Sequence, residues 1–300
     1  MRTRAFSFVY AMPMLETPAD LETQVSAALR EDLGSGDVTA QLVPATQTVR
    51  GRVVTREAAI LCGRPWVEAT FHSLDPNIKL NWRAGDGARL TADQVIFEIA
   101  GAARAVLTGE RTSLNFLQLL SATATQARRF VDAIAGTGCI IIDTRKTLPG
   151  LRTAQKYAVR CGGAQNHRMG LYDMVLIKEN HIAAAGSLAG AIEAARRVAP
   201  HVPVEVEVES LAEFAEALAA RPDIIMLDEF TPADMRKAVA LNRADARPVK
   251  IEASGSVTLE TVRTIAETGV DYISVGSLTK HVRAIDLSMR LEFTAGDVPR

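Results

Sequence analysis

The chain has 300 residues, enough for one large domain or two smaller ones. Hydrophobic residues make up 48% of the sequence, an ordinary share for a globular protein with a substantial core. Aromatic residues make up only 5%, which gives no indication of a stacking surface for single-stranded nucleic acid, and the formal net charge of −1 argues against general attraction to nucleic acid or membranes.

The N-terminus and the cysteines bear on location. The first 14 residues contain two arginines and a short apolar run, but they include Pro13 and lack a small-residue cleavage site, so we interpret them as an extension without a targeting role. No stretch is long and apolar enough for a transmembrane helix. Cys62, Cys139 and Cys161 have neither metal-ligand spacing nor an even count, which is typical of reduced thiols in a cytoplasmic protein.

The first third of the chain predicts a small α+β unit. Residues 20–33 have the apolar spacing of a helix that ends at Gly34. Residues 48–61 mix Val, Thr and Ile with charged residues, as half-buried strands do, and Gly85-Asp86-Gly87 predicts a turn. Residues 103–135 are predicted to be mostly helical, with candidate core positions at Leu107, Leu114, Leu117, Leu120 and Phe130.

From residue 139 the pattern changes to alternating strands and helices. Apolar strand-like runs occur at 139–142, 174–177, 204–208, 224–227, 249–253 and 272–275. Between them, Ser210 and Glu213 have the spacing of a capping box, and Gly269 is placed to end a helix. Such alternation is typical of parallel strands, and six strands are fewer than a complete barrel needs. We therefore predict an incomplete, open α/β barrel of parallel strands that follows the N-terminal α+β domain.

Polar residues follow or end each of these six runs. They are Arg145 and Lys146, then Lys178, then Glu205, Glu207 and Glu209 on one face of the third strand, then Asp228, Ser254-Gly255-Ser256 and Gly276-Ser277. In parallel barrels the carboxyl ends of the strands form one rim, where active sites are built. The two Gly-Ser turns lie on the last two strands, where a phosphate is often held. The sequence therefore predicts a site at this rim.

The charge pattern predicts that the ligands are anions. Between Thr144 and Lys178 there are seven basic residues, at 145, 146, 152, 156, 160, 168 and 178, against one acid, Asp173. This excess indicates two anionic groups, or a diacid beside a phosphate. Glu207 and Asp228 are suited either to ribose-type hydroxyls or to Mg2+ beside a pyrophosphate. A solvated basic face and an internal salt-bridge network remain alternatives, and His167 is open to either a structural hydrogen bond or a substrate contact.

At this point the residues resemble a known family, quinolinate phosphoribosyltransferase. Residues 144–181 carry the long, specific motif TRKTLPGLRTAQKYAVRCGGAQNHRMGLYDMVLIKENH. Supporting motifs follow the family's order: EDLGSGDVT (31–39), GERTSLNFLQ (109–118), VEVEVESL (204–211), MLDEF (226–230), IEASG (251–255) and ETGVDYISVGSLTKHV (267–282). The resemblance covers nearly all of the chain after residue 20. It implies an N-terminal α/β domain at 1–113, a phosphoribosyltransferase barrel at 114–280, and a segment 281–300 that packs on the first domain.

The resemblance also implies a reaction and its residues. Quinolinate and phosphoribosyl pyrophosphate would give nicotinate mononucleotide, pyrophosphate and CO2, a step of NAD biosynthesis, with Mg2+ as cofactor and a homodimer that shares its sites. Arg145, Arg168 and Lys178 would hold the quinolinate carboxylates beside His167, and Arg111 would enter from the partner subunit. Lys146, Glu207 and Asp228 would be catalytic, the two acids also being the metal ligands. The donor's 5′-phosphate would be held by Ser254, Gly255, Ser256, Val275, Gly276 and Ser277, and Thr144 would also bind substrate.

Three residues depart from the family pattern, and three other functions remain open. Glu229 stands where Asn is expected, Ser256 where Gly or Asn is common, and Tyr172 where a small residue is usual. The alternatives are a phosphoribosyltransferase for nicotinate or another acid without decarboxylation, a Schiff-base aldolase that uses Lys146 or Lys178, and a non-catalytic phosphate- or nucleotide-binding protein. A monoacid would need fewer cations than this segment carries.

Overall fold

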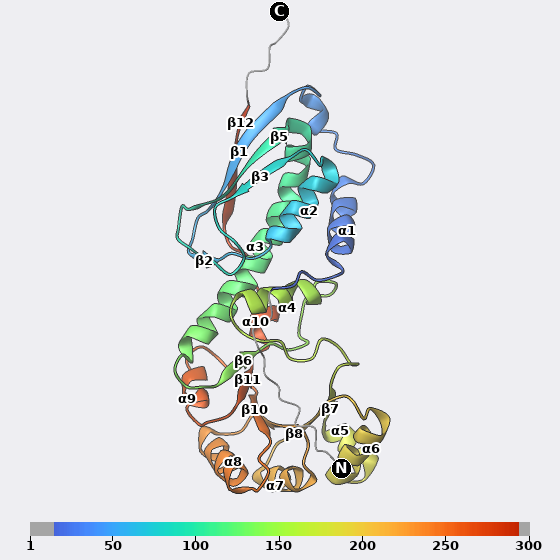
Figure 1. Ribbon diagram of the computed structural model, residues 1–300, viewed down its shortest axis with the longest axis vertical. Helices are drawn as coiled ribbons and strands as arrows, with labels where there is room; N and C mark the ends of the chain where they lie inside the picture. The colour runs from blue at the N-terminus through green and yellow to red at the C-terminus, as the bar shows by residue number, and fades with distance from the viewer. Residues whose placement is uncertain (1–14, 294–300) are drawn as a thin grey trace, which may run out of the picture.

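The computed structural model describes residues 15–293, and these form two lobes joined by one long helix (Figure 1). The first lobe contains a four-stranded antiparallel sheet, in the order β12-β1-β5-β3, and a two-stranded sheet, β2-β4. Its elements are α1 (Leu21–Leu33), η1 (Ala40–Leu42), β1 (Thr48–Thr55), β2 (Ala59–Ile60), α2 (Arg64–Leu74), β3 (Lys79–Trp82), β4 (Arg89–Leu90), β5 (Val95–Ala102) and β12 (Leu287–Phe293).

The predicted elements of the first lobe are confirmed where the sequence was most regular. Helix α1 ends where expected, at Gly34, whose φ of 51° is left-handed. Strand β1 buries Val49 and Val53 and exposes Arg50 and Arg52, the alternation of a sheet with one covered face. Helices α1 and α2 cover that lobe beside the long helix (Figure 1). The sheet therefore presents charged side chains on one face and the apolar core on the other.

Strand β12 brings the end of the chain back to the first lobe. It pairs antiparallel with β1, from Val49 opposite Phe293 to Thr55 opposite Leu287. Leu287, Met289 and Leu291 pack against the same core as β1 and β5. The first lobe thus contains two distant parts of the chain, and residues 294–300 of the predicted packing segment lie outside the described residues.

Helix α3 (Ala103–Ala133) is continuous and crosses residue 113, where the sequence placed the domain boundary. Leu114 and Leu117 pack in the core of the first lobe, whereas Phe130 packs in the core of the barrel. Leu120 lies between them in a third cluster, and Leu107 is only half-buried, unlike the other candidate core positions. Because one helix contributes to all three cores, it fixes the first lobe relative to the barrel.

The second lobe is a six-stranded parallel sheet in the order β6-β11-β10-β9-β8-β7. Its strands are β6 (Ile140–Ile142), β7 (Val175–Ile177), β8 (Val204–Val208), β9 (Ile224–Asp228), β10 (Lys250–Ser254) and β11 (Tyr272–Ser274). The helices are α4 (Arg152–Cys161), α5 (Glu179–Ala185), α6 (Leu188–Val198), α7 (Leu211–Ala220), α8 (Pro232–Ala244), α9 (Val262–Ala266) and α10 (Ser277–Lys280). Since β6 and β7 end the order and do not pair with each other, the barrel is open, as predicted.

Two local predictions in the barrel differ from the structure. Ser210 caps α7 by accepting the Glu213 N–H, but the Glu213 carboxylate accepts from the Glu209 N–H, so the capping box is only half formed. Helix α9 ends at Ala266, three residues before Gly269, which has a φ of 93° and continues the turn into β11. The glycine therefore allows a left-handed turn, and the helix is shorter than its sequence indicated.

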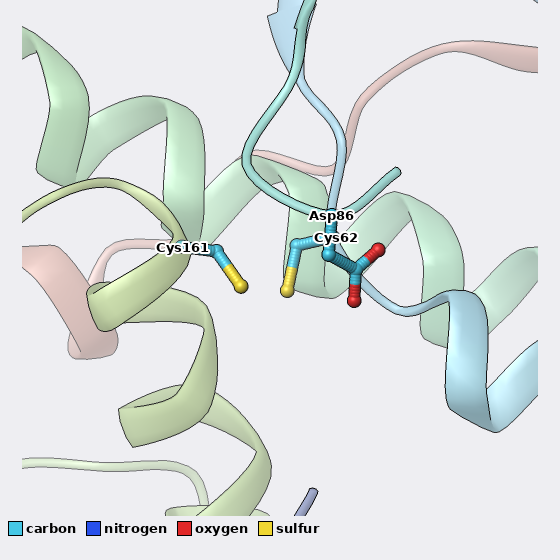
Figure 2. Close-up of side chains that lie close together, drawn as sticks. All are labelled: Cys62, Asp86 and Cys161. Carbon is cyan, nitrogen blue, oxygen red and sulfur yellow. The ribbon is translucent and has the colours of Figure 1, made fainter. Parts of the chain in front are cut away.

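The two lobes also meet at a small buried cluster (Figure 2). Cys62, which follows β2, and Cys161, at the end of α4, direct their sulfur atoms toward each other beside Asp86. These three residues place ligand atoms within 4.8 Å of one another, a proximity that their sequence spacing did not indicate. The Asp86 carboxylate accepts the Tyr157 hydroxyl at 2.8 Å and the N–H groups of Gly63 and Arg64 at 3.2 and 3.1 Å. Its hydrogen bonds therefore tie α4 of the barrel to the start of α2.

Among residues 15–293, no helix combines the length and the apolar character needed to cross a membrane.

Candidate active site

The polar strand ends of the barrel converge, and part of them surrounds one cavity of about 690 Å3. Eight of the predicted site residues line it: Thr144, Lys146, Asp228, Ser254, Gly255, Ser256, Gly276 and Ser277. Lys280 and His281, from the end of α10, line it too, together with Glu229 and Glu260. The prediction that the last two strands deliver their Gly-Ser turns to one place is therefore confirmed.

The other predicted residues are outside the lining of this cavity. Lys178 and Glu207 belong to the ends of β7 and β8, and His167 reaches β8 through Glu205. Val275 is 1% exposed and packs in the barrel core, so it offers the rim only its backbone. Arg111 is exposed on α3. Gln126, which does line the cavity, is 15 residues further along that helix, a rise of about 22 Å.

Lys146 is directed into the cavity by its neighbours. Its N–H donates to the Thr144 hydroxyl at 3.0 Å, and its carbonyl accepts the Thr279 hydroxyl at 2.8 Å. The side chain crosses Gly276 so closely that a Cβ at that position would lie 3.0 Å from the Lys146 Cδ. A side chain at Gly276 would therefore require the Lys146 side chain to shift by a few tenths of an ångström. Lys146 itself is exposed and has no ion-pair partner among the described residues.

The two Gly-Ser turns differ in the structure that comes after them. Helix α10 begins at Ser277, directly after Gly276, whereas α9 begins at Val262, well beyond Ser254. Of the two turns, the one at Gly276 leads straight into a helix N-terminus, and the one at Gly255 does not. In the other turn, Gly255 and Ser256 have left-handed φ values of 97° and 40°. This turn is shaped by backbone conformation instead of by a helix.

A buried ion pair positions the basic loop between α4 and β7. Lys156 is 1% exposed and Asp143 is 0% exposed, and the Lys156 Nζ donates to the Asp143 Oδ1 at 2.5 Å. The same amine donates to the His167 carbonyl, while Asp143 accepts from the Asn166 side chain and the His167 N–H. The Gln165 backbone also bonds to the edge of β6. His167 and Arg168 therefore follow a segment that is fixed on both sides.

This pair explains how the seven basic residues divide. Lys156 is consumed by Asp143, Arg152 donates to the Met169 carbonyl and the Thr147 hydroxyl, and Arg160 donates to the Glu16 carbonyl. Lys178 forms an ion pair with Glu207, whose side chain is only 10% exposed. The remaining three, Arg145, Lys146 and Arg168, have no acidic partner within 4.0 Å in the described part of the chain. The alternative of a closed salt-bridge network is therefore wrong for these three cations.

Arg145 and Arg168 form a cationic pair beside the barrel interior. The Nε of Arg145 is buried and has no hydrogen-bond partner among the described residues. Arg168 donates only to the Met174 carbonyl, at 3.2 Å. Burial lowers the pKa of Arg168, and the charge of Arg145 lowers it further. Because the charge of Arg145 acts on Arg168, the two guanidinium groups repel each other, and an anion placed against both would be bound strongly.

Beneath these arginines lie two buried carboxyls and an imidazole. The Nε2 of His167 is 2.7 Å from the Glu205 Oε2 and 3.6 Å from the Glu252 Oε2, and both glutamates are 0% exposed. Burial raises the pKa of Glu205 to about 7 and that of Glu252 well above its ordinary value, and it lowers the pKa of His167. Each shift favours an uncharged form. The neutral imidazole can then donate its Nε2 hydrogen to Glu205, which fixes the orientation of the ring.

Sequence reasoning missed three parts of this arrangement. The sequence predicts no role for Asp143. It places Lys156 among the basic residues of the segment 144–178, and it includes Glu252 only within the motif IEASG. A signal existed for Glu252, because it alternates with the apolar residues of β10 and so occupies one face of a buried strand. For Lys156 no such signal existed, since a lysine on an amphipathic helix is normally exposed.

The predicted metal ligands contribute two carboxylates and no complete cage. In the described residues, the groups of three or more potential ligands within 4.8 Å are Cys62–Asp86–Cys161 and His167–Glu205–Glu252, and neither contains Glu207 or Asp228. Asp86 already accepts three hydrogen bonds, so the first group has its oxygens occupied. Mg2+ typically keeps several waters and takes one or two protein carboxylates plus substrate phosphates. Asp228 lines the cavity, whereas Glu207 lies outside its lining and is paired with Lys178.

Family models and similar proteins of known name all indicate the same family for this chain. The model of the N-terminal domain of quinolinate phosphoribosyl transferase matches residues 37–121, and that of its C-terminal domain matches residues 123–290. Nicotinate-nucleotide pyrophosphorylase [carboxylating] of Mycobacterium leprae is 44% identical over 274 residues, covering 89% of this chain and 95% of the relative. Quinolinate phosphoribosyltransferase [decarboxylating] 1 of Nicotiana glauca is 37% identical over 292 residues, with 91% and 83% covered.

A solved structure shows the same architecture. The nicotinate-nucleotide pyrophosphorylase from Francisella tularensis superposes with a TM-score of 0.89 at 45% sequence identity. The match covers 92% of this chain and 98% of that one. Both lobes are therefore shared with that protein.

The first prediction concerns the buried ion pair. Lys156→Ala should lower the free energy of unfolding by about 3–5 kcal/mol, because it leaves the buried charge of Asp143 without compensation. Urea denaturation measures this change. Arg160→Ala is the matched control, since it removes a cation from the same helix that contacts only a backbone carbonyl and the face of a tyrosine. Wild-type stability in Lys156→Ala would show that the pair does not hold the loop.

The second prediction concerns Glu252. In the unfolded chain its carboxyl ionises near pH 4.5, and in the folded protein it ionises only at a higher pH. Its contribution to stability is therefore complete below pH 4.5 and is lost as the pH rises through the raised pKa. Glu252→Gln cannot ionise, so the wild type should lose stability relative to this variant as the pH is raised. Parallel stability curves across the pH range, measured by thermal unfolding, would contradict the raised pKa.

Proposed function

The chain belongs to the quinolinate phosphoribosyltransferase family, and we propose that its barrel mouth carries out the family reaction through the residues described above. Quinolinate accepts a phosphoribosyl group from phosphoribosyl pyrophosphate and loses one carboxylate, which yields nicotinate mononucleotide, pyrophosphate and CO2. The observation that carries the residue assignment is the presence of three cations without acidic partners at one rim, Arg145, Lys146 and Arg168, divided between two adjacent places.

The first place suits the pyridine diacid. The charge of Arg145 acts on Arg168, neither has an acidic partner within 4.0 Å among the described residues, and arginine's planar fork binds carboxylates through two parallel hydrogen bonds. Lys178 would add a third cation once it leaves its ion pair with Glu207, and His167 is hydrogen-bonded to Glu205. A dianion such as quinolinate compensates the two guanidinium groups, whereas a monoacid leaves one of them without a partner. This difference argues against the nicotinate-specific alternative.

The second place suits the phosphoribosyl donor. The cavity is lined by Lys146, by the Ser254–Ser256 turn and by Gly276 and Ser277, with Thr144 beside them. Backbone N–H groups of such turns bind phosphate, and Val275 would contribute only its main chain. Lys146 then lies between the two places, since it follows Arg145 in the chain and reaches across Gly276. It is thus positioned for the leaving pyrophosphate.

The charge of the cavity favours a donor that arrives with Mg2+. Its lining contains two lysines, Lys146 and Lys280, against three carboxylates, Asp228, Glu229 and Glu260, a balance of −1 if His281 is neutral. A bare polyanion would be repelled by this lining, whereas a magnesium complex would not. Mg2+ held by Glu207 and Asp228 with the pyrophosphate would neutralise charge on the leaving group.

The mechanism then depends mainly on position and charge. The nitrogen of the pyridine ring attacks the ribose carbon as the bond to pyrophosphate breaks, and Lys146 stabilises the departing oxygens. Positive charge develops on the ribose, where the carboxylate of Glu207 or Asp228 can stabilise it. The product pyridinium withdraws electrons, so the neighbouring carboxylate leaves as CO2 and its electron pair remains on the ring carbon, which then takes up a proton. No Schiff base is required, and the amine of Lys178 is already engaged by Glu207.

We also propose a homodimer in which Arg111 completes the partner's site. Arg111 is exposed and lies about 22 Å along α3 from the residue of that helix that lines the cavity. An arginine so far from its own cavity can serve the reaction only from another subunit. A cytoplasmic location agrees with three free cysteines.

The third prediction tests the reaction and the role of Lys146. Wild-type protein should release CO2 and pyrophosphate from quinolinate and phosphoribosyl pyrophosphate, and removal of Mg2+ with a chelator should abolish the release. Lys146→Ala should lower kcat at least about 100-fold, the usual cost of losing one group that stabilises developing charge. Its melting temperature should stay near that of the wild type, because Lys146 is exposed. Binding of phosphoribosyl pyrophosphate without product release would instead favour a binding protein, and borohydride trapping of a carbonyl substrate would favour an aldolase.

The fourth prediction tests the shared site. Arg111→Ala and Arg168→Ala should each be inactive alone, because each lacks a cation for the pyridine diacid. Mixed subunits should recover part of the activity, since one of the two sites in a hybrid dimer then contains both arginines. Subunit exchange must be demonstrated by a tag on one variant. An exchanged mixture that stays inactive would place Arg111 outside the partner's site.

A further inference from the structure

Glu229 occupies an unusual position at the end of β9. It follows Asp228 directly, has a left-handed φ of 51°, and donates its N–H to the Ser254 carbonyl at 3.1 Å. A residue with a Cβ rarely adopts this conformation, and it persists only where the surroundings hold it. The backbone therefore links the end of β9 to the turn that follows β10.

The Glu229 side chain lies against that turn. A Cβ on Gly255 would be 2.4 Å from the Glu229 Cδ and 2.7 Å from its Oε1, so the carboxyl packs directly on the glycine. The Ser256 hydroxyl donates to the same Oε1 at 2.8 Å, and Ser256 also has a left-handed φ, of 40°. Two strained non-glycine residues thus hold one carboxylate over the turn. Because Glu229 is exposed, packing in the protein core does not explain why its carboxylate is fixed in this position.

The charges around the Glu229 carboxylate make the binding of an anion beside it unfavourable. In the described residues Glu229 has no ion-pair partner within 4.0 Å, although it lines the cavity that also contains Lys146 and Lys280. Asp228 precedes it in the chain, so two carboxylates stand next to each other at the end of β9. A phosphate that enters the Gly255 turn meets the Glu229 carboxylate in the position it would take.

We propose that Glu229 is an affinity-determining residue for the phosphoribosyl donor, whose phosphate must displace the Glu229 carboxylate from the Gly255 turn before it can bind there. This inference rests on the proposed function, which assigns that turn to the donor. Glu229 would thus act in the free enzyme as an internal competitor that the bound donor releases. Its effect falls on donor affinity and leaves the chemical step unchanged.

Glu229→Gln tests the inference, with Glu260→Gln as the matched control. Both substitutions remove one negative charge from the lining of the same cavity, but the three atoms nearest to a Cβ on Gly255 all belong to Glu229. Glu229→Gln should lower the KM for phosphoribosyl pyrophosphate on the order of tenfold, as expected for one charge a few ångströms from a phosphate, with kcat little changed. Glu260→Gln should lower it less, and thermal unfolding should show that both variants fold.

A binding measurement separates this inference from the proposed reaction. Calorimetric titration with ribose 5-phosphate probes the phosphate turn without turnover, and Glu229→Gln should tighten its Kd by a similar factor. An unchanged or raised KM and Kd in Glu229→Gln, a raised requirement for Mg2+, or an equal gain in Glu260→Gln would each overturn the inference. If the wild type released no CO2 or pyrophosphate from quinolinate, the proposed function would fail, while the titration would still decide the role of Glu229 at the turn.

Discussion

The buried pair of Asp143 and Lys156 is the constraint on which the rest of the site depends. It joins the end of β6 to α4 and, through the His167 backbone, to the loop before β7. A buried pair of this kind contributes little net stability compared with apolar packing, but losing one partner is costly. Its value here is geometric, because two charges with fixed hydrogen bonds set the path of a loop more narrowly than apolar contacts can. The position of Arg168 depends on the path of this loop, because Arg168 directly follows His167.

Lys156 is compensated inside the protein by Asp143 and Lys178 by Glu207, whereas Arg145, Lys146 and Arg168 have no acidic partner within 4.0 Å among the described residues. Arg145 and Arg168 repel each other, and we propose that the carboxylates of the substrate relieve that repulsion. The buried carboxyls of Glu205 and Glu252 do not fully counteract the repulsion between the arginines, since burial favours their uncharged forms. A carboxyl whose pKa is raised counteracts the arginines less than a fully ionised one would. The substrates therefore meet cations that the protein itself has left without acidic partners.

The sequence predicted the barrel well and the electrostatics of its interior poorly. All six strands were predicted at their places because apolar runs between helices are a strong local pattern, and the rim followed from their direction. Lys156 was not predicted, because its burial depends on a partner 13 residues away, on another element. The contact of Cys62 with Cys161 was missed for the same reason. Local spacing indicates which element a residue belongs to, and only the packing of elements shows which charges meet.

The turns at Gly255 and Gly276 also show that similar sequences can pack against side chains of opposite charge. In the sequence, Gly255 and Gly276 are equivalent, each beside a serine at the end of a strand. In the structure, each glycine leaves room for a charged side chain, but Gly276 makes room for the cation Lys146 and Gly255 for the anion Glu229. Adjacent strands therefore present opposite charges at their ends, over turns whose backbones differ, since Gly276 has a φ of −67° and Gly255 a φ of 97°. If the donor's phosphates bind at these turns as we propose, a phosphate at the Gly276 turn would meet the cation Lys146, and a phosphate at the Gly255 turn would meet the carboxylate of Glu229.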